Sequence, residues 1–169
     1  MAKLIKDRHL TSDSWRLFEA PVTAADVPPS GDAIVPLALW LAHRDALAAR
    51  IGRTGVWLDG AEDPAVLAAD LARLPLVAVR FPKFSDGRGF SAGRLLRERY
   101  GFTGELRAIG DVLLDQLQFL HRCGFDAFAL RDDQDAAAAA AALDAFSEAY
   151  QASVLQPVPL FRRRLAATE

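Results

Sequence analysis

The chain has 169 residues, of which 51% are hydrophobic and 25% are charged, and its formal net charge is -2 at pH 7. This length supports one domain with a well-buried core, and the small net charge excludes a global field that would attract nucleic acid or an anionic membrane. A single cysteine, Cys123, excludes an intrachain disulfide and a four-cysteine metal cluster.

The opening residues lack the apolar core of a secretory signal peptide, and no run approaches the ~20 apolar residues that span a bilayer. We therefore expect a soluble, cytoplasmic protein. Neither a membrane nor a nucleic acid is expected as its partner.

Two β-prone runs near the start, LIK and SWRLFE, flank polar residues and predict an N-terminal β-hairpin within residues 1–19. Residues 20–32 contain three prolines and a glycine, which predicts an exposed connector. A body of alternating strands and helices follows over residues 33–150, and residues 151–169 form a tail. We expect all four segments to belong to a single domain, 1–169.

In the body, short β-prone runs alternate with helical patterns. The expected strands are residues 33–36, 54–59, 76–82, 105–110 and 126–131. The expected helices are residues 37–51, 63–74, 91–101, 111–123 and 135–150. Asp63 before Pro64 predicts the cap of the second helix, and Asp111 predicts the cap of the fourth.

The last helix contains seven consecutive alanines, which favour a helix but bury little. Leu143, Phe146 and Tyr150 are therefore expected to anchor it. The tail carries two prolines and then three arginines, Arg162 to Arg164. A terminal strand, a short helix and a flexible end all remain open for this segment.

Five consecutive strand and helix units require a mainly parallel sheet with right-handed crossovers, so the predicted fold class is α/β. A doubly wound sheet and a partial (β/α) barrel both satisfy the pattern, and periodicity does not separate them. In either architecture, ligands bind at the carboxyl ends of the strands.

The longest loop at that edge, residues 81–90, combines positive charge with glycines and leads into a helix. Glycine lets the backbone approach a ligand closely, and a helix N-terminus offers free N–H donors with roughly half a positive charge. We predict an anion site formed by Lys83, Gly87, Arg88, Ser91 and Arg94.

A structural interpretation competes with this site at two of its positions. Arg94 and Glu98 are four residues apart on the expected helix, a spacing at which they form an exposed ion pair. The DGRG sequence around Arg88 is a turn signature before it is a binding motif. It matches neither a Walker nor a dinucleotide-binding fingerprint.

The helix after the next strand presents polar residues at spacings of four, three and four, namely Asp111, Asp115, Gln118 and Arg122. We interpret this stripe either as a surface that faces a site or a partner, or as the solvated side of an amphipathic helix. Asp86 joins these residues as a candidate polar group.

We assign no metal site and no catalytic nucleophile. Aspartates near the strand ends, such as Asp59, Asp86, Asp111 and Asp132, have ordinary turn or capping roles. The histidines have no serine or cysteine at a recognisable catalytic spacing. Cys123, near a helix end, is expected to be a buried, inert thiol. Catalytic residues and cofactors therefore stay unknown.

The central stretch FPKFSDGRGFSAGRLLRERYGFTGELRAIGDVLLDQL, followed by RCGFDAFAL, closely resembles an uncharacterised bacterial family described as an oxidoreductase of sulfite reduction. LALWLAHRDAL and the early DSW extend the resemblance over most of the chain, although KDRH replaces a glycine-containing turn. The resemblance implies a role in assimilatory sulfite reduction and cysteine biosynthesis, with a sulfite reductase component as partner.

Whether the chain is itself an enzyme stays open. It has no glycine fingerprint for a nicotinamide or flavin, no iron–sulfur cysteine set and no haem ligand pair. One hypothesis is an accessory protein that binds sulfite reductase, or delivers its anionic substrate, through Lys83 and Arg88. The other is a small α/β enzyme that acts on a phosphate- or sulfate-bearing metabolite, with Asp86 or Asp111 available for proton transfer. The missing cofactor motif favours the accessory protein.

Overall fold

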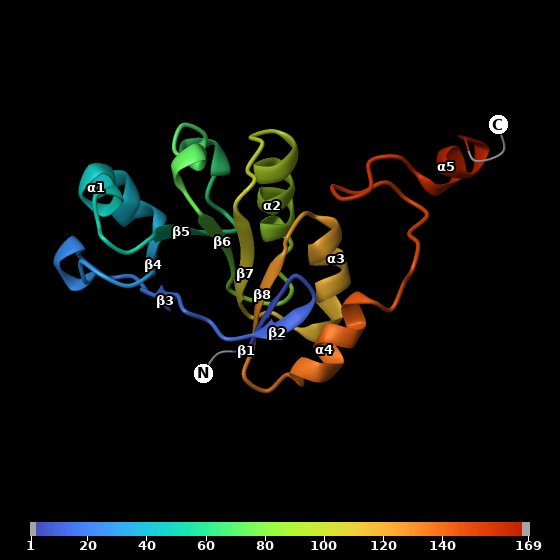
Figure 1. Cartoon of the computed structure of the whole chain (residues 1–169), viewed down its shortest axis with the longest axis horizontal. Coiled ribbons are helices and arrows are strands. Elements are labelled where there is room, and N and C mark those ends of the chain that lie inside the picture. Colours follow the sequence, from blue (N-terminus) through green and yellow to red (C-terminus); the bar gives the residue numbers. More distant parts are fainter. Residues whose placement is uncertain (1–2, 167–169) are drawn as a thin grey trace.

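The computed structural model describes residues 3–166, and its centre is an eight-stranded sheet of order β2-β1-β8-β7-β6-β5-β4-β3 (Figure 1). The strands are β1 (Lys3–Lys6), β2 (His9–Thr11), β3 (Arg16–Leu17), β4 (Ala33–Pro36), β5 (Thr54–Asp59), β6 (Leu76–Phe81), β7 (Glu105–Gly110) and β8 (Ala127–Leu130). The five predicted strands of the body are all present, three of them with the expected bounds.

Strands β3 to β8 are parallel and lie side by side in chain order, whereas β1 and β2 are antiparallel. A doubly wound sheet reverses its strand order at a switch point, and this sheet does not. Right-handed crossovers between neighbours in sequence place the connections on one face. The predicted α/β class is confirmed, in the form of a curled half-barrel.

Helical segments cover the convex face of the half-barrel (Figure 1). The helices are α1 (Leu37–Ala48), α2 (Arg88–Glu98), α3 (Leu117–Arg122), α4 (Ala136–Leu143) and α5 (Leu160–Ala166). The 3-10 turns are η1 (Ala24–Asp26), η2 (Pro64–Leu67), η3 (Leu71–Arg73) and η4 (Leu114–Gln116). Within residues 3–166, no helix is long and apolar enough to cross a membrane.

The expected helix over residues 63–74 is instead two 3-10 turns, η2 and η3. Its predicted cap is present, because the Asp63 carboxylate accepts a hydrogen bond from the Ala65 N–H at 2.9 Å. The break between the turns coincides with the buried Asp70, which accepts a hydrogen bond from the Trp40 indole at 3.0 Å. An inward-facing aspartate replaces the apolar side chain that a continuous helix would bury there.

The N-terminal hairpin is shorter than the 1–19 segment expected to contain it. It comprises β1 and β2 around Asp7 and Arg8, whose φ angles of 48 and 66 degrees are those of a tight two-residue hairpin turn. The second β-prone run crosses to the opposite edge of the sheet, where β3 pairs in parallel with β4. Residues 12–15, which we call the strap, therefore span the concave face.

The strap is held to the concave face by buried charge. The Arg107 guanidinium, 2% exposed, donates to Asp13 of the strap at 2.8 Å and pairs with Glu105 at 2.7 Å. Glu105 also pairs with Lys6 of β1 at 2.8 Å. Around these charges, the concave face buries Ile34, Trp57, Leu76, Ala78 and Ile109.

The chain after α4 differs from expectation. The last long helix ends at Leu143, and Phe146 and Tyr150, expected to anchor it, are both 69% exposed. Residues 144–166, the C-terminal arm, extend away from the sheet and end in α5, which is the short-helix alternative for the tail (Figure 1). Asp135 caps α4, since its carboxylate accepts a hydrogen bond from the Ala137 N–H at 2.8 Å.

Replacing Arg107 by alanine is expected to lower the free energy of unfolding by roughly 3–5 kcal/mol, because Asp13 and Glu105 would lose their shared partner inside the protein. Urea unfolding followed by circular dichroism measures the change. Arg94→Ala is the control, since an ion pair as exposed as that of Arg94 with Glu98 contributes little to stability. Equal stabilities for the two variants would refute the structural role of Arg107.

Candidate functional site

The predicted anion site lies on an exposed loop and on the start of α2. Arg88, its central cation, makes a two-pronged pair with Asp86, at 2.9 Å from Nε to Oδ1 and 2.6 Å from Nη2 to Oδ2. This guanidinium lowers the pKa of the Asp86 carboxyl to about 2. Arg88 therefore already holds a carboxylate in the position where an external anion would bind.

The other residues of the predicted anion site do not converge on one point. Lys83 and Ser91 are exposed, and Gly87 is the residue before the first turn of α2. Arg94 donates to Glu98 at 2.7 Å, as the structural interpretation of this position expects. Gly87 and Arg88 lie at the start of α2. The two arginines of the predicted anion site, Arg88 and Arg94, are both paired with carboxylates.

Asp111 does not cap a helix, and the polar stripe does not start with it. The chain bends at Asp111, and η4 begins only at Leu114, followed by α3. The Asp111 carboxylate instead accepts from the Phe84 N–H at 2.8 Å and from Arg131 at 2.7 Å. It fastens the loop after β6 to the end of β8, which lowers its pKa.

The other three stripe residues, Asp115, Gln118 and Arg122, line one cavity of about 660 Å³ between α3 and the C-terminal arm. We call this cavity the α3 groove. Its lining residues are Arg8, Asp115, Gln118, Phe119, His121, Arg122, Phe146, Ser147, Glu148, Ala149, Tyr150, Gln151, Ser153, Leu155 and Gln156.

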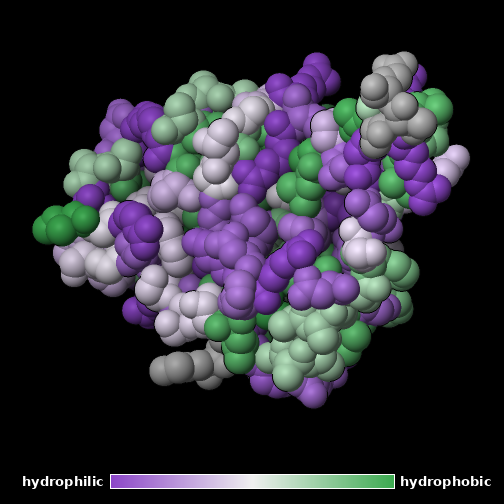
Figure 2. Space-filling model, turned by 45° about the vertical axis from the view of Figure 1, so that its right-hand side comes forward, coloured by the Kyte–Doolittle hydropathy of each residue, from purple (hydrophilic) through white to green (hydrophobic). Residues whose placement is uncertain are grey.

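Large apolar side chains gather at this groove with unusual exposure. Phe119 is 52% exposed, Phe146 and Tyr150 are each 69% exposed, and Leu155 is 52% exposed. Figure 2 shows strongly hydrophobic and strongly hydrophilic residues next to one another on the arm, at its upper right. Sequence reasoning missed these residues as site residues, because aromatic side chains after an alanine-rich helix indicate core anchors.

Arg122 joins the two walls of the groove. Its Nη2 donates to the Gln151 carbonyl at 3.3 Å, and its own carbonyl accepts from the Val154 N–H at 3.1 Å. Its Nε is buried and has no hydrogen-bond partner among residues 3–166. The Nε–H of Arg122 is therefore an unused hydrogen-bond donor in the wall of the groove that contacts the arm.

His121 lies behind the same wall. Its Nδ1 is 3.2 Å from the Phe125 carbonyl, which can only accept, so the neutral ring carries its proton there and its Nε2 faces Arg8 at 3.4 Å. Burial lowers the pKa of His121; the hydrogen bond to the Phe125 carbonyl opposes this in part, and the weaker effects of Arg8, which lowers the pKa, and of Asp144, which raises it, follow. The fold therefore favours the neutral ring.

Cys123, the next residue but one, is buried, and burial raises the pKa of its thiol. This is the setting of the inert cysteine predicted from the sequence. Within residues 3–166, no group of three or more histidine, cysteine, aspartate or glutamate side chains is arranged to hold a metal ion.

Acidification is expected to destabilise the protein through His121. Because its pKa is lower in the folded than in the unfolded chain, the unfolded chain takes up a proton first as the pH falls below about 6.5. The free energy of unfolding should fall between about pH 7.5 and 5.5, and His121→Asn should reduce that fall.

Urea titrations across this pH range measure the effect. His43→Asn is the matched control, since it makes the same substitution at an exposed histidine on α1. A pH dependence that is identical in His121→Asn and in the unaltered chain would contradict the assignment.

Together, the half-barrel and the groove define a small α/β protein in which exposed aromatic side chains line a cavity between α3 and the C-terminal arm. A family described as "Bacterial protein of unknown function (DUF934)" matches residues 55–161, and the chain belongs to this family. No curated protein matches the chain. The matched region contains the predicted anion loop, α3 and most of the C-terminal arm.

Proposed function

We propose that this chain is an accessory protein of assimilatory sulfite reduction and cysteine biosynthesis, and that it docks on a sulfite reductase component through the α3 groove. The resemblance of the central sequence, from FPKFSDGRG to RCGFDAFAL, supports the metabolic assignment. The observation that carries the docking assignment is that Asp115, Gln118 and Arg122 line the same cavity as several exposed aromatic side chains.

The composition of the groove supports a protein as the occupant. Aromatic residues and arginine are enriched at protein interfaces and supply most binding hot spots. Phe119, Phe146 and Tyr150 form the apolar part of the groove, and the charged residues Arg8 and Glu148 lie at the same cavity. A combination of exposed aromatic side chains and charged side chains at one cavity is consistent with the composition of protein interfaces.

The carboxyl edge of the sheet gives less support to substrate delivery or to an enzyme acting on a phosphate- or sulfate-bearing metabolite. Both would use Arg88, with Asp86 or Asp111 for proton transfer. In the fold, Arg88 is paired with Asp86, and Asp111 is paired with Arg131. An anion at this edge would have to displace a carboxylate that is already attached to the chain.

Binding to sulfite reductase is expected to weaken about tenfold or more in Tyr150→Ala and in Arg122→Ala, since loss of an interface hot spot costs roughly 2 kcal/mol. Biolayer interferometry with immobilised sulfite reductase, from a bacterium that encodes the chain, measures the dissociation constants. Thermal unfolding of each variant verifies that the fold is kept.

Arg94→Ala is the matched control, because Arg94 is an exposed arginine on α2 that does not line the groove. It should bind like the unaltered chain. Failure of the unaltered chain to bind would refute the proposal, as would binding that Arg88→Ala abolishes while Tyr150→Ala leaves it intact.

A further inference from the structure

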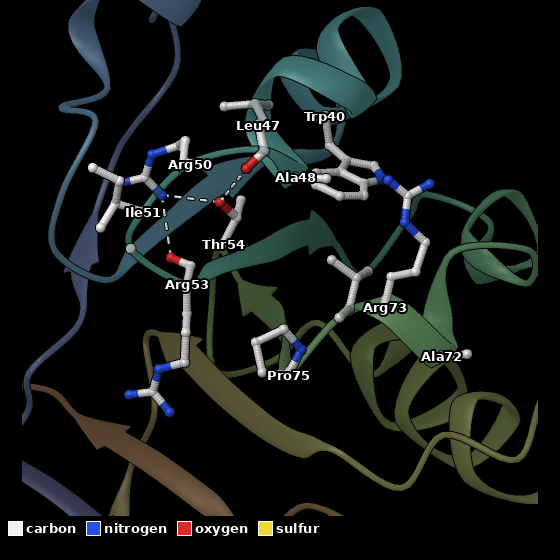
Figure 3. Close-up of a pocket in the computed structure, with 12 residues that line it drawn as sticks. Trp40, Leu47, Ala48, Arg50, Ile51, Arg53, Thr54, Ala72, Arg73 and Pro75 are labelled. Carbon is white, nitrogen blue, oxygen red and sulfur yellow. Dashed lines mark hydrogen bonds between the residues drawn. The ribbon is translucent and has the colours of Figure 1, made fainter.

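A second cavity, of about 500 Å³, lies at the opposite edge of the sheet from the predicted anion site, where β5 and β6 begin (Figure 3). Its walls include Trp40 and Leu47 of α1, Arg50, Thr54 of β5, Arg73 of η3 and Pro75. We call it the amino-end cavity. No functional role was predicted for these residues from the sequence.

Arg50 brings a poorly neutralised charge to this cavity. It donates four hydrogen bonds, to the carbonyls of Pro28, Gly31 and Arg53 and to the Thr54 hydroxyl, at 2.7 to 3.1 Å. All four acceptors are uncharged, and no carboxylate within residues 3–166 forms an ion pair with it. A guanidinium has five N–H donors, so one remains on Nη2.

Burial costs this guanidinium favourable hydration and lowers the pKa of Arg50, against a smaller opposing attraction from the Asp32 carboxylate, which is paired with Arg53. An anion in the adjoining cavity would restore part of the lost electrostatic stabilisation. Figure 3 shows Arg50 on one side of the cavity and Arg73 on the other, with Thr54 between them.

Arg73 supplies the second cation. Its only ion pairs within the described chain are with Asp45 and Asp70, both at 3.9 Å, which is beyond hydrogen-bond distance. Asp70 is already engaged by the Trp40 indole at 3.0 Å and by Arg44 at 2.9 Å. The Arg73 side chain is 47% exposed and its donors are free to bind a ligand.

The other charges near the cavity leave a positive excess. Arg53 also lines it, but its guanidinium turns away and is satisfied by Asp32 (Figure 3). Counting these pairs, four arginines at positions 44, 50, 53 and 73 face three aspartates at positions 32, 45 and 70. This local excess contrasts with the net charge of -2 for the whole chain.

We propose that the amino-end cavity binds a tetrahedral oxyanion, either free or as the sulfate or phosphate group of a small metabolite, between Arg50 and Arg73. Charge-assisted hydrogen bonds from guanidinium groups suit such an anion. The apolar walls at Trp40, Leu47 and Pro75 leave room for an attached organic group. This site does not rest on the docking function, since α1 and the C-terminal arm lie at opposite ends of the molecule (Figure 1).

Nuclear magnetic resonance of the ¹⁵N-labelled full chain tests the site, with sulfate, inorganic phosphate and phenyl phosphate as probes. The amide signals of Gly52, Thr54 and Arg73 should move on titration. Arg73→Gln should weaken binding about tenfold, the factor that corresponds to about 1.4 kcal/mol. Tighter binding of phenyl phosphate than of inorganic phosphate would identify an anionic group on a metabolite as the ligand, and equal binding would identify the free anion.

Arg94→Gln is the control, because it removes an exposed arginine from α2 and should leave binding unchanged. The proposal is overturned if none of the three probes moves these signals. It is also overturned if the affected amides lie in residues 83–94 and Arg88→Gln, rather than Arg73→Gln, abolishes binding.

Discussion

The ion pairs of Arg107 with Asp13 and Glu105 hold together parts of the chain that hydrogen bonding along the sheet leaves apart. An open half-barrel presents a concave face that must be covered, and here the strap covers it. A guanidinium that is 2% exposed needs both carboxylates, so the strap cannot leave without stranding a buried charge. The path of the strap in turn brings β3 to the far edge of the sheet.

Because the parallel strands lie side by side in chain order, their order determines where the charged edge of the sheet and the two cavities are. At the carboxyl edge, Arg88 after β6 is paired with Asp86, and Arg131 after β8 is paired with Asp111 after β7. The α3 groove lies beyond the last parallel strand and uses the C-terminal arm as its second wall. The amino-end cavity lies below α1, where Arg50 is bonded only to uncharged acceptors. The exposed aromatic side chains of the α3 groove and the excess positive charge around Arg50 therefore lie at different ends of the half-barrel.

Local patterns in the sequence predicted the parallel strands closely, because a run such as ELRAIG is bounded by turn residues and buried on both faces. These local patterns gave wrong predictions where contacts between residues far apart in the sequence determine the structure. The run RL in β3 finds its partner in β4 rather than in β1, and Asp111 bonds to Phe84 and Arg131 rather than to a helix start. Phe146 and Tyr150 indicated a helix anchored in the core, and only the fold shows that they line a groove with Arg122.

Hydrogen exchange read by mass spectrometry, on the chain alone and with sulfite reductase, tests the docking account most directly. The account predicts slower exchange in peptides from residues 115–122 and 146–156, the two walls of the α3 groove, with little change in residues 83–94. Slower exchange confined to residues 83–94 would contradict it, because the partner would then bind at the carboxyl edge of the sheet.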